Sequence, residues 1–438
     1  MTPNSSRLGH RLMTVATMAL IGAATSEAQS PLQQVTFTRD VAPIFQQKCE
    51  TCHRPDSIAP MSLRTYEEAR PWARSIRARV DARQMPPWHI DKTAGIQQFQ
   101  NDRSLSEAQL ATVLAWVDQG AVKGDAKDLP AVIAWPVGQG WNYAARFGQT
   151  EPDLVIRNQP WTMKAGEGNT WFKRLVDSGV TEPRWVRAIE VRPGTVKGRR
   201  IVHHANVEID QVEPDGSLTS GRFMEWAVGK EGELMRPDTG RLIMPNSKIS
   251  WDVHYASTTE DVTDAVEMGL YFYPKGQEPK YRQSLVSVGS SGSDLDIPPN
   301  AIASHEGFFV LSKAARIESF QPHMHLRGKA QALEAILPTG QTVLLSHVDN
   351  FNFNWHNSYI YADDVAPLLP KGTVLKGTSW HDNTAANKAN PDPNVWVGYG
   401  ERTVDEMNHI WVSITYLDEA DYLTEVEARR GKLTQQRR

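Results

Sequence analysis

Hydrophobic positions follow two different periods along this chain of 438 residues. Up to about residue 120 they recur at helical spacing, which predicts helices over 40–47, 65–83 and 104–120. From about residue 150 apolar and polar positions alternate, which predicts strands over 185–191, 200–210, 249–255, 315–326 and 409–416. We therefore expect a helical segment followed by antiparallel β structure.

Local signals place the ends of the predicted helices. Ser104 and Glu107 have the spacing of a capping box and begin the third helix, and Gly120 ends it. Pro71 lies inside the second helix and is a candidate new start within it. The pattern thus predicts three helices connected by loops.

The only two cysteines of the sequence lie in one motif, Cys49-Glu-Thr-Cys52-His53. In this C-x-x-C-H pattern two thioether bonds hold a c-type haem, and the adjacent histidine binds its iron. Because both cysteines are used here, a disulfide or a zinc site is disfavoured. We predict one covalent haem c, and three helices around it indicate a small all-α cytochrome c domain.

The sixth iron ligand is expected from the loop before the third helix. Met85 precedes Pro86-Pro87, and proline keeps this stretch out of a helix, so that its thioether is available to the iron. Met61 and His89 are the alternatives, and Met85 packing only on the haem edge is the other interpretation.

The N-terminus and the charge balance indicate the compartment. Arg7 and Arg11 precede an apolar run over 12–24, and small residues follow at 26–28, so we interpret 1–28 as a cleaved signal peptide. The protein is then periplasmic or secreted, although an uncleaved anchor stays open. A net charge of −4 without a basic stripe disfavours nucleic-acid partners, and no later stretch is apolar enough for stable membrane insertion.

Strand alternation places several histidines away from the apolar faces. In the strand over 315–326, Gln321, His323 and His325 share the face opposite the apolar residues. Near the C-terminus Met407 falls on the face opposite an apolar one, where we expect it to be exposed. A thioether beside a His-x-His pair is a soft donor set that suits copper.

The earlier strands carry a second histidine group. His254 alternates against apolar neighbours, and His203 and His204 are consecutive. Consecutive residues point to opposite faces of a regular strand, so both reach one metal only if a bulge or a strand end turns one of them.

Together these groups resemble the type II copper monooxygenases, the family of peptidylglycine α-hydroxylating monooxygenase and dopamine β-monooxygenase. The likeness covers about 150–425, and Thr403-Val-Asp-Glu-Met407 is similar to the family's T-x-D-E-M signature. The resemblance implies two jelly-roll-like domains, each with one copper. The implied ligands are His203, His204 and His254 for the first copper, and His323, His325 and Met407 for the second.

Further segments refine the resemblance. Gln321 is similar to the amine-hydroxylating branch, because the peptide-hydroxylating branch has an arginine there. The segment Trp380-His-Asp-Asn-Thr384, with Asn387 and Asn390-Pro391, is similar to bacterial members that also carry an N-terminal cytochrome. The chain departs from the animal members in lacking cysteines for disulfides and in the residues 408–411, so the substrate does not carry over.

The predicted fold is therefore multidomain, with a small all-α cytochrome c domain followed by two all-β antiparallel, jelly-roll-like sandwich domains. The expected parts are the signal peptide 1–28, the cytochrome c domain 33–125, a linker 126–149, the first copper domain 150–286, a linker 287–300, the second copper domain 301–425 and a tail 426–438.

The resemblance implies a copper-dependent monooxygenase that hydroxylates a C–H bond of a small organic substrate with O2. An external donor, either a redox protein or a small reductant, would supply electrons through the haem. Two alternatives remain: a haem and copper electron carrier or copper-binding protein without oxygenase activity, and a periplasmic binding protein with structural histidines. His347, His356 and His381 are expected to form hydrogen bonds, and Glu406 is either a partner that orients an imidazole or a solvated carboxylate.

Overall fold

The computed structural model describes residues 34–55, 57–135, 140–230, 232–289 and 294–436. The predicted signal peptide, 1–28, lies outside these residues. The chain from Val35 onward forms one compact unit.

Short helices occupy the segment before residue 130. They are the π-helical η1 (Phe37–Val41), α1 (Ala42–Lys48), α2 (Tyr66–Ala69), the 3-10 turn η2 (Arg70–Trp72), α3 (Ala73–Asp81), α4 (Glu107–Asp118) and the 3-10 turn η3 (Ala126–Asp128). The predicted second helix is interrupted, because Pro71 lies in η2 between α2 and α3. The predicted capping box was two residues early: Ser106 caps α4 with Gln109, while the Ser104 amide donates to the Asp102 carboxylate in a turn.

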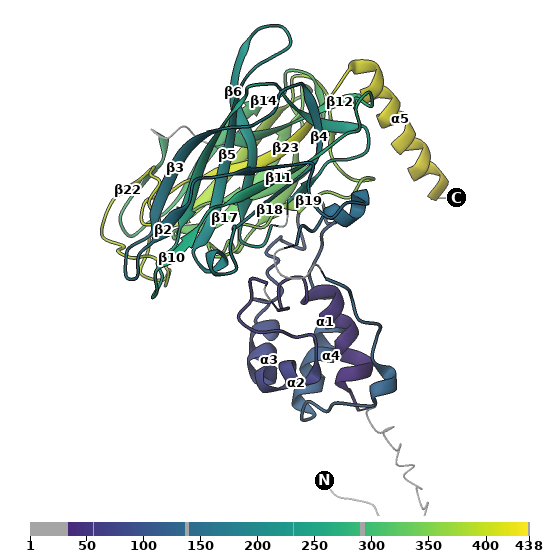
Figure 1. Ribbon diagram of the computed structural model, residues 1–438, viewed down its shortest axis with the longest axis vertical. Helices are drawn as coiled ribbons and strands as arrows, with labels where there is room; N and C mark the ends of the chain where they lie inside the picture. Colours follow the sequence, from purple (N-terminus) through teal and green to yellow (C-terminus); the bar gives the residue numbers. More distant parts are fainter. Residues whose placement is uncertain (1–33, 56, 136–139, 231, 290–293, 437–438) are drawn as a thin grey trace, which may run out of the picture. The chain divides into compact units, whose positions relative to one another are not determined.

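Two sheets face each other in the first β half (Figure 1). One runs in the order β3-β9-β5-β6, and the other begins β1-β11-β4-β8. The connection η4 (Ala144–Phe147) precedes them and η5 (Lys197–Arg200) precedes β5. The strands of this half are β1 (Leu154–Arg157), β2 (Trp161–Met163), β3 (Thr170–Asp177), β4 (Arg184–Arg192), β5 (Val202–Val212), β6 (Leu218–Ala227), β7 (Glu233–Leu234), β8 (Thr239–Ile243), β9 (Lys248–Tyr255), β10 (Val262–Asp264) and β11 (Glu267–Phe272). Of these, β2 and β10 pair with each other in a separate two-stranded sheet.

The second β half has the same layered construction. The sheet β14-β21-β17-β18 packs against a layer that contains β12, β23, β15 and β20. Its strands are β12 (Tyr281–Val288), β13 (Asp296–Ile297), β14 (Ile302–Val310), β15 (Ala314–Ile317), β16 (Ser319–His323), β17 (Gly328–Ile336), β18 (Thr342–Val348), β19 (Tyr359–Ile360), β20 (Leu368–Leu369), β21 (Val374–Asp382), β22 (Val397–Gly398) and β23 (His409–Leu417), followed by α5 (Glu419–Gln436). The predicted strand over 315–326 is divided at Glu318 into β15 and β16.

The two β halves are not independent sandwiches. Parallel β12 and β8 pair at Tyr281 and Thr239, and β12 also pairs with β23. These pairs join one layer of each half into a single 11-stranded sheet. Alternation along one strand does not show which distant strand it pairs with, so the sequence could not show this join.

The predicted fold class is therefore wrong, and the cytochrome c part of it has no counterpart. Among the described residues the structure is mostly β with short helices, and no all-α cytochrome domain is evident. The segment that follows α3 belongs to the β core instead. Ile90 forms a bridge with Val348 and Phe99 with Tyr361, and Trp88 packs on Tyr359 with ring centroids 4.6 Å apart.

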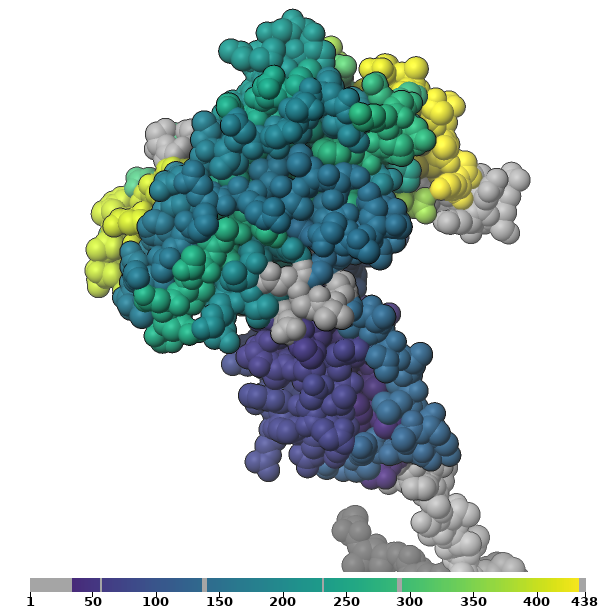
Figure 2. Space-filling view, in the orientation of Figure 1, coloured from purple at the N-terminus to yellow at the C-terminus, as the bar shows by residue number. Residues whose placement is uncertain are grey.

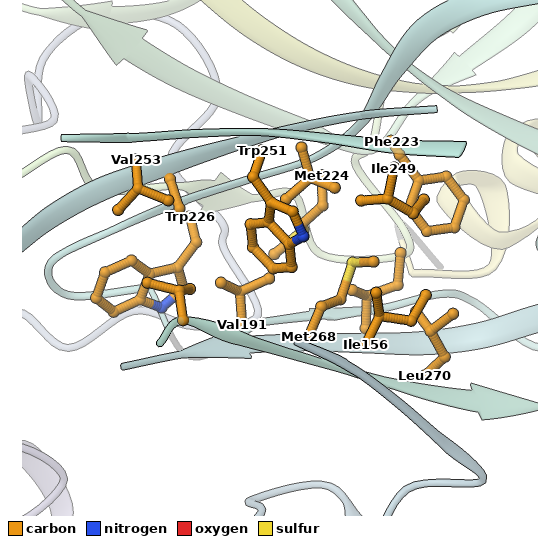
Figure 3. Packing of buried hydrophobic residues seen from close by; sticks show 14 of the residues in the cluster. Ile156, Val191, Phe223, Met224, Trp226, Ile249, Trp251, Val253, Met268 and Leu270 are labelled. Carbon is orange, nitrogen blue, oxygen red and sulfur yellow. The ribbon is translucent and has the colours of Figure 1, made fainter. Parts of the chain in front are cut away.

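Apolar side chains fill the space between the sheets. In the first half Ile249 and Trp251 of β9 face Met268 and Leu270 of β11, with Val191 of β4 beside them (Figure 3). Trp251 is fully buried and the others are at most 1% exposed. Burial on this scale contributes roughly 1.5–3 kcal/mol for each large side chain, so the layers hold together without disulfides.

The β5–β6 hairpin extends beyond this core. In the space-filling view its tip projects past the neighbouring strands (Figure 2), and Leu218 and Val212 at the tip are 84% and 50% exposed. The opposite ends of the same strands carry His203 and His204 in β5 and Glu225 in β6.

Candidate metal centre

Three histidines of the first β half converge on one point. His203 and His204 begin β5, and His254 lies in the neighbouring β9. The β5–β9 register shifts between Val202 and His204, so that His204 pairs with His254 and His203 is the extra residue of a bulge. The three ring centroids are 5.0 to 5.5 Å apart. The sequence required a bulge or a strand end for both consecutive histidines to reach one point, and the structure has a bulge next to the start of β5.

Trp171 fixes the orientation of this cluster. It lies in β3, opposite His254 across the ladder, and its ring stacks on that imidazole at 4.7 Å with an interplanar angle of 10°. The same indole meets the edge of His204 at 4.8 Å. Its nitrogen donates to the Glu401 carbonyl at 2.8 Å, which holds the indole in place.

Burial keeps these imidazoles neutral. Desolvation, together with repulsion from neighbouring histidines, lowers the pKa of His203 to about 4 and that of His254 to about 3. The pKa of His204 also falls well below its ordinary value because the ring is buried. Neutral imidazoles are the form that binds a transition metal.

The cluster fits a copper ion. One nitrogen of each of the three rings lies within 4.8 Å of the others, so metal bonds of about 2.0–2.1 Å require only small shifts. The Nδ1 atoms of His203, His204 and His254 have no hydrogen-bond partner among the described residues. Three imidazoles around one point, each with an unengaged Nδ1, suit copper or zinc.

The second predicted ligand set lies at one end of the β16–β23 pair. His323 ends β16 and pairs with His409 at the start of β23. The His323 and His325 ring centroids are 5.7 Å apart. His325 and Met407 each lie two residues beyond the His323–His409 pair, outside the strands. The His325 amide donates to the side chain of Glu406, the residue before Met407, so the two segments that carry the predicted ligands are in contact.

The expectation that Met407 is exposed is wrong. Met407 is 7% exposed, and His323 and His325 are each 2% exposed. Their face points away from one apolar core but is covered by other parts of the chain. The His204 ring lies 5.4 Å from His323, and the Phe353 ring lies 6.0 Å from His325.

Glu406 holds the turn that carries these ligands. Its side chain is fully buried and accepts hydrogen bonds from the backbone amides of His325 at 2.9 Å, Arg327 at 2.5 Å and Met407 at 3.4 Å. Burial raises its pKa to about 8, and the Arg327 and His325 amides oppose that rise. Glu406 is thus a positioning residue, and the solvated interpretation is wrong.

The segment 380–391 supports the same turn. Asn383 accepts from the Arg327 guanidinium at 2.8 Å, and the Asn387 amide donates to the Leu326 carbonyl at 3.0 Å. Asn390 donates to Asn383 at 3.0 Å. These side chains act through Arg327 and Leu326, next to His325, rather than at the histidine cluster.

His356 and Glu225 are site residues that the sequence prediction missed. Both are buried, and their ligand atoms and that of His323 lie within 4.8 Å of one another. The prediction of a hydrogen-bonding role for His356 is wrong, since neither ring nitrogen has a partner of good geometry among the described residues. Two features of the sequence could have indicated these residues. Glu225 is an acidic residue inside the apolar stretch 223–227, and His356 directly follows the aromatic-rich segment 351–355.

Gln321 belongs to a buried polar network. Its amide nitrogen donates to the Glu225 carboxylate, and its oxygen accepts from the Lys230 ammonium at 3.1 Å. Lys230 also donates to Glu233 at 2.8 Å. The network fixes one carboxylate oxygen of Glu225, while the other has no hydrogen-bond partner among the described residues.

Two other histidine predictions are confirmed. His347 contacts the Asp91 carboxylate at 3.0 Å, and His381 Nε2 lies 3.1 Å from the Met407 carbonyl oxygen. Both rings are therefore engaged in hydrogen bonds.

The haem motif follows α1. Cys49 and Cys52 are thiols rather than a disulfide. His53 Nδ1 lies 3.2 Å from the Met61 carbonyl oxygen, an arrangement that leaves Nε2 for an iron. These residues fit a covalent haem. Met85 lies between α3 and α4, whereas Met61 packs with Cys49 on the helical core, and Met85 stays a prediction.

Comparison with known proteins does not identify a family. No protein-family model and no curated protein matches the chain. Solved structures with weak likeness include an f-lectin (fucolectin) from striped bass serum, with 12% identity over 59% of this chain and 86% of that one and a TM-score of 0.16. The VP2 subviral particle of infectious bursal disease virus has 8% identity over 62% of this chain and 74% of the viral chain, with a TM-score of 0.19. Allantoicase has 10% identity over 53% of this chain and 83% of its own, with a TM-score of 0.16. Scores this low carry no functional argument.

The structure also contains a cavity that lies apart from the histidines. A cavity of about 640 Å³ is lined by Glu213, Arg222, Arg241 and Arg282 among others, and no histidine lines it. None of the helices in the described ranges is both long and apolar enough to span a membrane.

Proposed function

We propose that the protein is a copper-dependent monooxygenase that hydroxylates a C–H bond of a small organic substrate with O2. The observation that carries the proposal is the meeting of two ligand sets from different β halves, with His204 and His323 5.4 Å apart. Burial lowers the pKa of both His204 and His323, which keeps these imidazoles neutral, and Met407 lies two residues before His409, the strand partner of His323.

The residues have separate roles. His203, His204 and His254 would hold one copper, and His323, His325 and Met407 would hold the other, where the thioether favours the Cu(I) state. Bound copper would supply the one-electron steps that reduce O2 and place one oxygen atom in a C–H bond. Trp171 orients His254, and Glu406 fixes the backbone that carries His325.

Burial is part of the proposed chemistry. His204, His254, His323 and Met407 are all below 9% exposed, so bulk water is largely excluded from the donors. Exclusion of water strengthens electrostatic interactions and limits side reactions of reduced oxygen.

Electron entry is assigned to a haem bonded to Cys49 and Cys52, with His53 as an iron ligand. An external redox protein or a small reductant would reduce this haem, and attachment to the same chain raises the effective concentration of the donor at the coppers. Oxygen, an organic substrate and the electron donor are the proposed partners. Haem attachment at such motifs occurs outside the cytoplasm, which supports a periplasmic or secreted location.

The test is metal analysis followed by an oxygen assay. The purified protein should contain two coppers for each haem after copper loading, and a substrate panel should contain compounds that accelerate O2 consumption. One copper or none for each haem would contradict the assigned ligand sets.

A second function is favoured by the burial of the rings. His204 is 1% exposed and His323 is 2% exposed, an enclosure that also suits an electron carrier or copper-binding protein that turns over no substrate. Two bound coppers without copper-dependent O2 consumption would assign the protein to that class.

A further inference from the structure

His356 is a buried imidazole placed among potential metal ligands. It lies between β18 and β19, is 1% exposed, and is flanked by Phe351 and Phe353, each with its ring centroid 5.7 Å away. The His323 ring is closer, at 4.5 Å and nearly perpendicular. The loop thus inserts a nitrogen donor beside the end of β16.

Neither nitrogen of His356 has a hydrogen-bond partner of good geometry among the described residues. The Phe353 carbonyl only partly opposes the fall in pKa that burial causes. Buried polar groups normally have a partner, and each exception requires an explanation. A metal ion would provide the missing partner.

Glu225 supplies an independent second observation. It is fully buried in β6, and its Oε1 has no hydrogen-bond partner among the described residues. Gln321 engages only the other oxygen, and Lys230, 3.7 Å from that oxygen, shares its charge with Glu233. One carboxylate oxygen therefore remains available.

The two unengaged groups meet at His323. One ligand atom from each of Glu225, His323 and His356 lies within 4.8 Å of the others. Two imidazoles and one carboxylate are a common donor set for divalent transition metals. We propose that Glu225, His323 and His356 form a binding site for a divalent transition-metal cation such as Zn²⁺ or Cu²⁺.

This site shares His323 with the second copper ligand set of the proposed function. The inference rests on the proposed function only through this shared residue. A single ion at His323 has two alternative donor sets. The set with Met407 is soft and suits Cu(I), whereas the set with Glu225 and His356 contains a carboxylate and suits a divalent ion. The two sets predict different effects of substitution.

Zinc binding distinguishes the sets. The full-length protein, stripped of metal with a chelator, is titrated with Zn²⁺ against a chromophoric competitor. Changing groups that only orient a ligand weakens metal affinity by about 10–100-fold. His356→Gln removes a ligand and should weaken one zinc site by at least about 100-fold, whereas Met407→Leu should leave that site unchanged.

Two further variants complete the titration. Glu225→Gln should weaken the same site by at least about 10-fold, because the amide retains the shape but loses the charge. His305→Gln is the matched control, since His305 lies in β14, in a different sheet from Glu225 and His323, and contacts the Asp296 carbonyl. Zinc affinity of His356→Gln equal to that of wild type and of the control would overturn the inference.

A spectroscopic measurement keeps the test independent of variant folding. X-ray absorption of the zinc-loaded wild-type protein should show nitrogen and oxygen scatterers without sulfur, and a sulfur shell would overturn the inference by assigning Met407 to the ion. The proposed function fails separately. If zinc binding depends on His356 but the copper-loaded protein never consumes O2, the site stands and the oxygenase does not.

Discussion

Replacing Glu406 should destabilise the protein and loosen the second copper set together. The Glu406 carboxylate is fully buried and receives the backbone amides of His325 and Arg327 at 2.9 and 2.5 Å, with a longer contact from Met407. These bonds tie the end of the His-x-His segment to the start of β23.

The structure gives the expected size of the effect. Glu406→Ala leaves two well-formed buried amide donors without an acceptor, at about 1–3 kcal/mol each, so the free energy of unfolding should fall by about 4 kcal/mol. Glu406→Gln retains one carbonyl acceptor and loses the other, so it should cost about 2 kcal/mol. Because His325 and Met407 are no longer held, Cu(I) affinity should fall by about 10–100-fold in both variants.

Urea unfolding followed by tryptophan fluorescence measures the first effect, and competition with a Cu(I) chelator measures the second. Glu306→Ala is the control, because Glu306 is a partly exposed partner of Lys376 and its loss should cost less than about 1 kcal/mol. Glu406 variants as stable as this control would refute the positioning role.

Three further predictions follow from the other sites. The double change Cys49→Ser and Cys52→Ser should remove turnover driven by a redox protein but spare turnover driven by a small reductant, and equal loss of both would show that the haem is not the electron entry. Met407→Leu should weaken Cu(I) binding more than Cu(II) binding, as measured with oxidation-state-specific chelators, and equal weakening would argue against a thioether ligand. Two hydrogen bonds from Arg282 at 2.7 and 2.8 Å, with others from Gln211 and Thr219, lower the pKa of Glu213 to about 2. Because this pKa lies below that of Glu213 in the unfolded chain, the stabilisation is present above about pH 4.5 and is lost as the pH falls toward 2. After solvent screening at the half-exposed arginine, the stabilisation should be about 2 kcal/mol. Acid unfolding of Glu213→Gln should lack this pH-dependent loss of stability.

Strand alternation predicted the β elements because it depends only on neighbours in the chain. The strands at 185–191, 249–255 and 409–416 lie within β4, β9 and β23. Strand parity also required a bulge or a strand end for His203 and His204 to reach one point, and the structure has a bulge at His203. These predictions needed no knowledge of distant contacts.

Apart from the capping box, which was placed two residues early, the following failures involve contacts between distant segments. Alternation assigned Met407 to an outer face, but that face is covered by parts of the chain far away in sequence. The pairing of β8 with β12 and the packing of Trp88 on Tyr359 likewise depend on residues widely separated in the sequence. The same reason explains why His356 was expected in an ordinary hydrogen bond: its neighbours are set by the fold.

Copper-dependent O2 consumption tests the central claim most directly. The copper-loaded protein, washed with a chelator to remove loosely bound metal and then fully reduced, is mixed with O2, and consumption is followed with an oxygen electrode beside His323→Ala treated in the same way. We predict consumption by the wild-type protein that is lost in His323→Ala. Equal rates in the two proteins would contradict the assignment of this centre to oxygen chemistry.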